Sequence, residues 1–174
     1  MICKDKKGSP FELRAYGADD YSFLQEMYDS FSPKAKFQGM PPLKNETRQE
    51  WIRKLLDSGE NLLAWRGDSV IGHVVVMPDT RALDGEFLIF VHQDDRNLGV
   101  GTQLARSILE RAKTLGLKKI WLMVGTYNFT AIRLYKKCGF DYFENPGGPE
   151  RPTFSSHLSR GCASGSTGCT GTAG

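Results

Sequence analysis

The residues best suited to chemistry lie in the segment 91–104, VHQDDRNLGVGTQL, where an apolar run ends in a polar turn and an amphipathic helix follows. The first turn of a helix presents unpaired backbone N–H groups and the positive end of the helix dipole. Gly99 and Gly101, one residue apart, would let an anion come close to that backbone. The segment therefore predicts a site for a phosphate or pyrophosphate group.

Taken by itself, this turn is compatible with other interpretations. A glycine-rich turn before a helix can be only a tight connection between two elements. The dinucleotide-binding pattern G-x-G-x-x-G is absent because position 104 is leucine. The P-loop pattern is absent as well, because no Gly-Lys-Ser/Thr follows the glycines.

A second segment downstream strengthens the interpretation as an anion site. It reads N-x-x-A-x-x-x-Y-x-x-x-G-F, from Asn128 through Tyr135 to Phe140. Together with R-x-x-G-x-G, which begins at Arg96, it resembles the two hallmark segments of the GNAT superfamily of N-acetyltransferases. Both segments occur in the expected order, and the resemblance covers nearly everything except the C-terminal tail. It implies an acyltransferase that uses acetyl-CoA as co-substrate.

The resemblance also implies how acetyl-CoA would be held. The strand before the glycine turn splays from the next strand, and its exposed backbone pairs with the pantetheine arm. The backbone amides from Asn97 to Thr102 and the Thr102 hydroxyl would bind the pyrophosphate, and Asn128 would bind the arm. The implied cofactor-binding residues are Ile89, Val91, Arg96, Asn97, Leu98, Gly99, Val100, Gly101, Thr102, Asn128 and Tyr135. Arg133, Lys136 and Lys137 are either ligands of the ribose phosphate or a solvated helix face.

Acetyl transfer to an amine needs a neutral amine, a stabilised oxyanion and a proton for the leaving thiolate. The resemblance implies direct attack by the amine, with Tyr135 as the acid and a backbone N–H near Ile89 as the oxyanion donor. The alternative for Tyr135 is to pack its helix against the sheet. Glu86, at the start of the central strand, is the candidate base, and its alternative is a solvent-facing glutamate. His92 ranks below Glu86, and His73, in an alternating strand, is expected to be structural.

Hydrophobic patterns predict the elements that position these residues. Strands are expected at Phe11–Ala15, Asn61–Arg66, Ser69–Met77, Glu86–His92, Lys119–Val124, Phe140–Phe143 and Pro152–Leu158. Helices are expected from a cap at Asp19 through Phe31, from a cap at Asn45 to Gly59, over Gly99–Leu115 and over Thr130–Lys137. The order β-α-α-β-β-β-α-β-α-β predicts an α/β (α+β) protein with helices on both faces of a mixed sheet. With the resemblance, this becomes a mostly antiparallel GNAT sheet of six or seven strands, splayed between the central strands.

The composition fits one domain of 174 residues, with 40% hydrophobic and 25% charged residues. The net charge of +3 without a basic stripe argues against a nucleic-acid partner. No apolar stretch approaches the roughly 18–20 residues of a membrane span, so a cytoplasmic protein without a membrane partner is expected. The four cysteines lack C-x-x-C spacing, so no metal site is expected, and Cys138 is interpreted as a core residue.

The chain divides into an acetyltransferase domain, residues 1–160, and a tail, residues 161–174, GCASGSTGCTGTAG. The tail lacks charge and bulky apolar residues, so we expect it to be flexible. The alternative is that it packs across a neighbouring subunit of a homodimer. The resemblance implies an acceptor site on the side opposite CoA, walled by the first two helices, the loop 32–44 and the last hairpin. A small-molecule amine or amino acid is preferred as the acceptor. A protein lysine, a protein N-terminus or a non-catalytic acyl-CoA-binding module of the same fold is the alternative.

Overall fold

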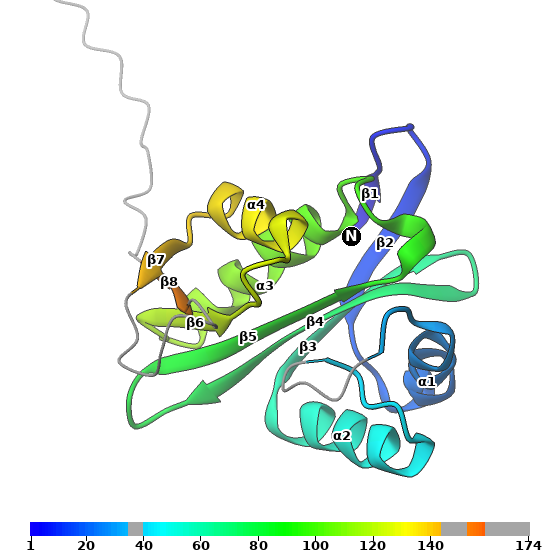
Figure 1. Ribbon diagram of the computed structural model, residues 1–174, viewed down its shortest axis with the longest axis horizontal. Coiled ribbons are helices and arrows are strands. Elements are labelled where there is room, and N and C mark those ends of the chain that lie inside the picture. The colour runs from blue at the N-terminus through cyan, green and yellow to red at the C-terminus, as the bar shows by residue number, and fades with distance from the viewer. Residues whose placement is uncertain (35–39, 144–152, 159–174) are drawn as a thin grey trace, which may run out of the picture.

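Eight strands form one open, twisted sheet in the order β1-β2-β3-β4-β5-β6-β8-β7 in the computed structural model, which describes residues 1–34, 40–143 and 153–158 (Figure 1). The strands are β1 (Ile2–Lys4), β2 (Pro10–Ala15), β3 (Glu60–Arg66), β4 (Ser69–Asp79), β5 (Asp84–Val91), β6 (Lys119–Met123), β7 (Asp141–Phe143) and β8 (Thr153–His157). The expected tail, part of the loop 32–44 and Pro152 of the last expected strand lie outside the described residues.

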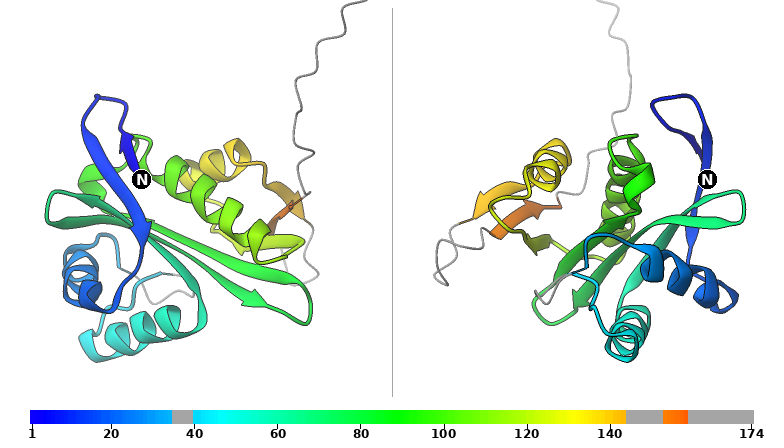
Figure 2. Two further views of the ribbon diagram at one scale, coloured as in Figure 1. Left: turned by 180° about the vertical axis from the view of Figure 1, so that it is seen from behind. Right: turned by 45° about the vertical axis from the view of Figure 1, so that its right-hand side comes forward.

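Within the described residues, four helices cover the sheet, α3 and α4 on one face and α1 and α2 on the other (Figures 1 and 2). Their bounds are α1 (Tyr21–Ser30), α2 (Asn45–Ser58), α3 (Val100–Thr114) and α4 (Phe129–Lys137), with short 3₁₀ turns η1 (Ala18–Asp20) and η2 (Gln93–Asp95). None of the helices in these described ranges is long and apolar enough to cross a membrane. The arrangement confirms the predicted fold class.

Each face of the sheet carries its own hydrophobic core, because successive side chains of a strand point to opposite faces. Val74 and Val76 of β4 pack with Leu104 and Ile108 beneath α3. The opposite cluster joins Leu63 of β3 and Phe90 of β5 to α1 and α2, with the fully buried residues Leu24, Tyr28 and Ile52. The central strands β3, β4 and β5 are therefore covered on both sides.

The predicted hairpin β3–β4 turns at Gly67, whose φ of +58° lies in the region that glycine enters without strain. The next two strands, β4 and β5, pair antiparallel without interruption. Their ladder runs from Asp79 opposite Asp84 to Gly72 opposite Val91. These long ladders make β5 a rigid support for the turn that follows it.

Strands β5 and β6 are parallel, and their pairing covers only Asp84–Glu86 of β5 and Lys119–Trp121 of β6. Beyond this point, among the described strands, β5 is paired with β4 alone as it continues to Val91 (Figure 1). The His92 N–H donates to Ile71 O at 2.9 Å across β4. Because hydrogen bonding alternates along an antiparallel strand, the backbone groups of Ile89 and Val91 point away from β4. The predicted splay is thus present between β5 and β6.

The described sheet contains eight strands, whereas six or seven were predicted. The additional strand is β1, which pairs with β2 from Ile2 opposite Glu12 to Lys4 opposite Pro10. A segment of three residues beside several lysines is too short to show an alternating pattern.

Both predicted helix caps are wrong. Asn45 is the first residue of α2, and the cap residue is Lys44. The Asn45 side chain instead accepts a hydrogen bond from Arg48 Nη2 at 3.2 Å. At α1 the cap residue is Asp20 and not Asp19, and the Asp20 carboxylate binds the Gly17 N–H and Arg14.

His73 is structural, as predicted, and lies in a fully buried hydrogen-bonded chain. The Asn61 Nδ2 group donates to the carbonyls of Leu55 and Gly59, so Asn61 Oδ1 must accept from His73 Nε2, at 2.8 Å. His73 Nδ1 therefore accepts from the Tyr28 hydroxyl at 2.7 Å. Burial lowers the pKa of His73 from 6.5 to about 3, so the folded protein holds this ring neutral.

We predict that acid destabilises the protein through His73. Below pH 6.5 the unfolded chain takes up a proton that the folded chain does not, so the free energy of unfolding falls as pH drops toward 3. At pH 5 this loss amounts to roughly 2 kcal/mol. The variant His73→Gln keeps a donor and an acceptor and does not titrate. Urea unfolding between pH 7.5 and 5 should show a steeper loss for the wild type, whereas equal slopes would contradict the prediction.

Candidate active site

The turn between β5 and α3 has the backbone that an anion site requires. Asn97 and Gly99 both have positive φ, +63° and +96°, and Gly99 is the N-cap residue of α3. The Gly99 carbonyl accepts from the N–H groups of Thr102 and Gln103 at 3.1 and 3.2 Å. Because a helix has no earlier carbonyls for its first N–H groups, those of Val100 and Gly101 face out of the helix start. The Thr102 N–H already donates to the Gly99 carbonyl, so a ligand contact of Thr102 would use its hydroxyl.

Gly101 serves close packing. A Cβ atom at this position would lie 3.3 Å from Val91 Cγ2 and 3.4 Å from Leu134 Cδ2, distances that are tight for carbon atoms. The missing side chain thus lets α3 approach β5 and α4 closely. At Gly99 the nearest atom to a Cβ would be Lys6 Cγ, at 3.8 Å. The two glycines of the motif therefore have different roles, a left-handed turn at Gly99 and a close contact at Gly101.

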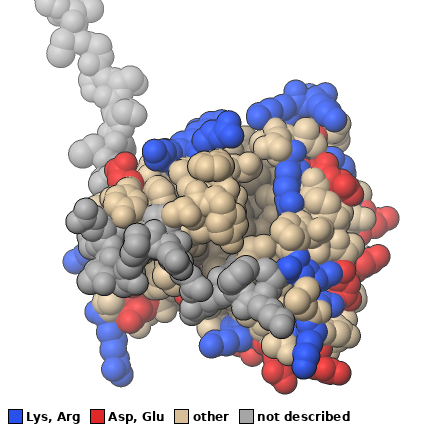
Figure 3. Space-filling view, in the orientation of Figure 1, with Lys and Arg blue, Asp and Glu red and all other residues tan. Residues whose placement is uncertain are grey.

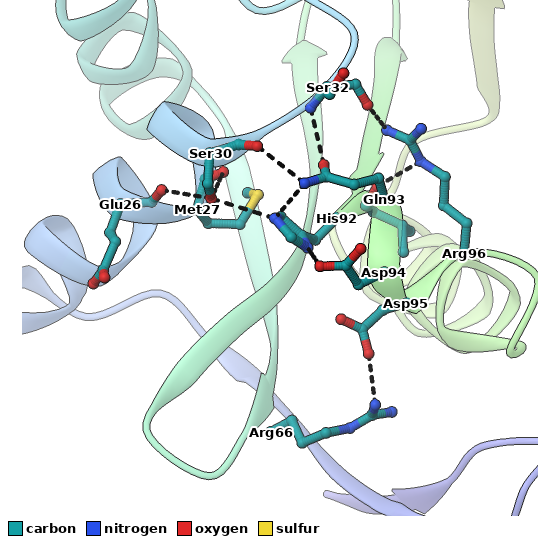
Figure 4. A network of polar contacts seen from close by, with 11 residues as sticks. Glu26, Met27, Ser30, Ser32, Arg66, His92, Gln93, Asp94, Asp95 and Arg96 are labelled. Carbon is teal, nitrogen blue, oxygen red and sulfur yellow. Dashed lines mark hydrogen bonds and ion pairs between the residues drawn. The ribbon is translucent and has the colours of Figure 1, made fainter.

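The Arg96 side chain points toward the end of α1 (Figure 4). Its Nε donates to Val91 O at 3.0 Å, and its Nη2 donates to Ser32 O. The guanidinium lies 5.1 Å from the centre of the Phe31 ring, close enough for a cation–π contact. Arg96 therefore links the turn to the start of the loop after α1. The Val91 carbonyl is already bound, so a ligand would use the Val91 N–H.

Gln93 strengthens the same link, and no motif in the sequence predicts this role. Gln93 Oε1 accepts from the Ser32 N–H at 2.9 Å, and Gln93 Nε2 donates to Ser30 O at 3.0 Å. His92 joins the network through Gln93 Nε2 at 2.9 Å (Figure 4). Gln93 and Ser32 are distant in sequence, and only the folded chain brings them together.

Glu86 lies at the point where β5 and β6 separate, because Glu86–Trp121 is their last pair. It is half-buried and belongs to the alternating set with Leu88 and Phe90, which face α1 and α2. Burial raises the pKa of Glu86 above its usual 4.5, and the nearby Lys54 of α2 opposes this shift. A carboxyl group in this position can accept a proton near neutral pH.

Tyr135 of α4 lies on the opposite face, where it contacts Phe87 of β5 with ring centres 6.0 Å apart. It is only 8% exposed and also packs edge-on against Phe140, at 5.9 Å. Burial raises the pKa of Tyr135 well above its usual 10.0, so the phenol keeps its proton at neutral pH. The two predicted catalytic side chains thus lie on opposite faces of the sheet near the same gap.

Comparison with known proteins identifies the family. The model of the acetyltransferase (GNAT) family matches residues 23–140. The chain belongs to this family.

The relatives include an uncharacterised N-acetyltransferase, YvbK, of Bacillus subtilis, 36% identical over 90 residues, which are 51% of this chain and 57% of YvbK. The chain therefore spans little more than half the length of that relative. The L-methionine sulfoximine/L-methionine sulfone acetyltransferase of Pseudomonas paraeruginosa is 27% identical over 74% of this chain and 79% of its own. The solved structure of yncA from Salmonella typhimurium with its cofactor acetyl-CoA superposes with a TM-score of 0.66 at 18% identity, over 88% of this chain and 96% of that one.

Asn128, the first residue of the second GNAT segment, is the N-cap residue of α4, and its Oδ1 accepts from the Ala131 N–H at 3.2 Å. Any ligand contact of this side chain would therefore use its Nδ2 group. Arg133, Lys136 and Lys137 of α4 are exposed. Basic side chains stand on both sides of a hollow in the molecular surface (Figure 3). Cys138 packs against the core beneath α3 and α4, as predicted.

We predict that Gly101→Leu destabilises the fold by about 1–3 kcal/mol, because the new side chain would enter the space of Val91 and Leu134. The matched control, Arg106→Leu on the exposed face of the same helix, should change stability by less than about 0.5 kcal/mol. Urea unfolding of both variants measures the effect. If Gly101→Leu unfolds at the same urea concentration as the wild type, the close approach of α3 to Val91 and Leu134 is absent.

Proposed function

We propose that the protein transfers the acetyl group of acetyl-CoA directly to a primary amine, with a small-molecule amine or an amino acid preferred. The observation that carries this proposal is the gap beside β5, where pairing with β6 ends at Glu86. Glu86 and Tyr135 lie near this gap on opposite faces of the sheet. Donor and acceptor would therefore approach the reacting centre from different sides, as direct transfer in a ternary complex requires.

The donor would lie along the free side of β5. The backbone groups of Ile89 and the N–H of Val91 would bind the pantetheine arm, because they point away from β4. The N–H groups at the start of α3 and the Thr102 hydroxyl would bind the pyrophosphate. Acetyl-CoA supplies the activated thioester.

Three groups of the chain would carry the proton and charge changes. The Glu86 carboxylate accepts a proton from the acceptor ammonium, directly or through water, and leaves a neutral amine. The Ile89 N–H stabilises the negative charge that develops on the thioester oxygen as the C–N bond forms. The Tyr135 hydroxyl donates its proton to the sulfur as the C–S bond breaks. The acetylated nitrogen then loses its second proton, directly or through water, to the Tyr135 phenolate, which restores the phenol.

The preference for a small amine is supported by the relative from Pseudomonas paraeruginosa, which is named for acetylating amino-acid analogues. The test is thiol release from acetyl-CoA with a panel of amino acids, polyamines, lysine peptides and peptides with a free N-terminus. We expect release with a small amine and an N-acetylated product by mass spectrometry. Release with peptides alone would favour a protein acceptor. Acetyl-CoA binding with no release for any amine would indicate a binding module.

For Tyr135→Phe we predict a loss of turnover of about 10²-fold, because the acid is removed while the ring packing is kept. Acetyl-CoA affinity should be nearly unchanged. The matched control is Tyr142→Phe, which removes the hydroxyl of an exposed tyrosine in β7. Steady-state kinetics and calorimetric titration separate the two effects. If Tyr135→Phe turns over like the wild type, this side chain only packs.

For Glu86→Gln we predict a changed pH profile. The base works only when it is deprotonated, so kcat/KM of the wild type should rise as pH passes upward through the raised pKa of Glu86. The variant should lose this limb and fall by about 10²-fold at neutral pH. Asp84→Asn, on the same strand, should keep the limb. An unchanged limb in Glu86→Gln would assign the base to another group.

A further inference from the structure

The loop between β1 and β2 (residues 5–9) contacts the turn that begins α3 (Figures 1 and 2). The Lys6 N–H donates to Leu98 O at 2.9 Å. The loop is held in shape by Asp5, whose Oδ1 accepts from the N–H groups of Lys7 and Ser9 at 2.8 and 3.0 Å. The family model matches only from residue 23, so this hairpin lies outside the matched region.

Arg66 fixes the hairpin and the turn relative to each other. Its Nη2 lies 2.8 Å from Asp5 Oδ2, and its Nη1 lies 2.6 Å from Asp95 Oδ1. The side chains of Asp5 and Asp95 are only 1% and 9% exposed, so both charges depend on this partner. The position of Lys6 beside the turn is therefore a fixed feature of the fold.

The Lys6 side chain passes beside Gly99, with its Cγ 3.8 Å from the place of a Cβ on that glycine. The ammonium group is three bonds further along this exposed side chain. In the parts of the chain that the structure describes, no carboxylate forms an ion pair with Lys6, since Arg66 pairs with both Asp5 and Asp95. The Lys6 ammonium can therefore extend from this position toward the outward N–H groups of Val100 and Gly101.

We propose that the Lys6 ammonium group binds a phosphate of acetyl-CoA, so that the hairpin β1–β2 forms a wall of the donor site. This inference rests on the proposed function. The N–H groups at the start of α3 can bind one side of a phosphate, and Lys6 adds a full charge from a second element. Basic side chains on both sides of the hollow in Figure 3 agree with a polyanionic ligand.

The test is the acetyl-CoA dissociation constant by calorimetry at low salt for the wild type and Lys6→Met. Methionine keeps the unbranched stem beside Gly99 and removes the charge. We expect affinity to fall about three- to tenfold, and the difference to shrink at high salt. Lys6→Arg should bind within about twofold of the wild type, because it restores the charge.

Two matched controls remove the same charge elsewhere. Lys7→Met acts on the neighbouring residue, and Lys118→Met acts beyond the far end of α3, about 22 Å along a helix of 15 residues. Both should bind acetyl-CoA like the wild type. A loss in Lys7→Met as large as that in Lys6→Met would show only a general charge effect and overturn the assignment.

Dephospho-CoA, which lacks the 3′-phosphate, distinguishes the two phosphate sources. If Lys6→Met weakens binding of both ligands equally, the contact is with the pyrophosphate; if it weakens only CoA binding, the contact is with the 3′-phosphate. Equal acetyl-CoA affinity of Lys6→Met and wild type would overturn the proposal while the proposed function stands. Failure of the wild type to bind acetyl-CoA would overturn both.

Discussion

The early end of pairing between β5 and β6 is the constraint on which the rest of the site depends. Three residues of each strand pair, and among the described residues no strand pairs with the rest of β5 on that side. Backbone N–H and C=O groups need partners, so the free side of β5 is suited to a ligand that carries amides of its own. The long ladder between β4 and β5 holds this free edge rigid, because every residue from Asp84 to Val91 has a partner on β4.

The same strand places the groups of both faces. Alternation along β5 turns Glu86 toward α1 and α2, and it turns Phe87, which contacts Tyr135, toward α4. Where β5 ends, Gly101 lets α3 start close to the strand. Arg96 and Gln93 then bind the first residues after α1. One strand thus connects the proposed donor site with the proposed acceptor site.

Local sequence patterns predicted the features that depend on neighbouring residues. The hairpin at Gly67–Asp68, the strand that ends in His92, and the helix between Gly99 and Gly116 all follow from hydrophobic period and turn residues. The strand β1 was missed because it is too short to show a period. The cap predicted at Asp19 was wrong because the 3₁₀ turn Ala18–Asp20 precedes α1 and places Asp20 at the cap position. The cap predicted at Asn45 was wrong because this residue already belongs to α2 and its side chain accepts from Arg48.

The partners of site residues were harder to predict, because they come from distant parts of the chain. Arg96 was expected to serve the cofactor on the basis of its motif, and in the fold its guanidinium binds Ser32, 64 residues away. Arg66 and Asp5 form an ion pair across 61 residues. Such contacts are set by the packing of the sheet, which a spacing of residue types does not encode.

The most direct test of the account is hydrogen exchange of single β5 amides, measured by NMR with and without acetyl-CoA. If the cofactor binds along the free side of β5, exchange at Ile89 and Val91 should slow on binding. Leu88 and Phe90, whose amides already face β4, should change little. An unchanged exchange rate at Ile89 and Val91 under saturating acetyl-CoA would contradict the placement of the donor in the gap between β5 and β6.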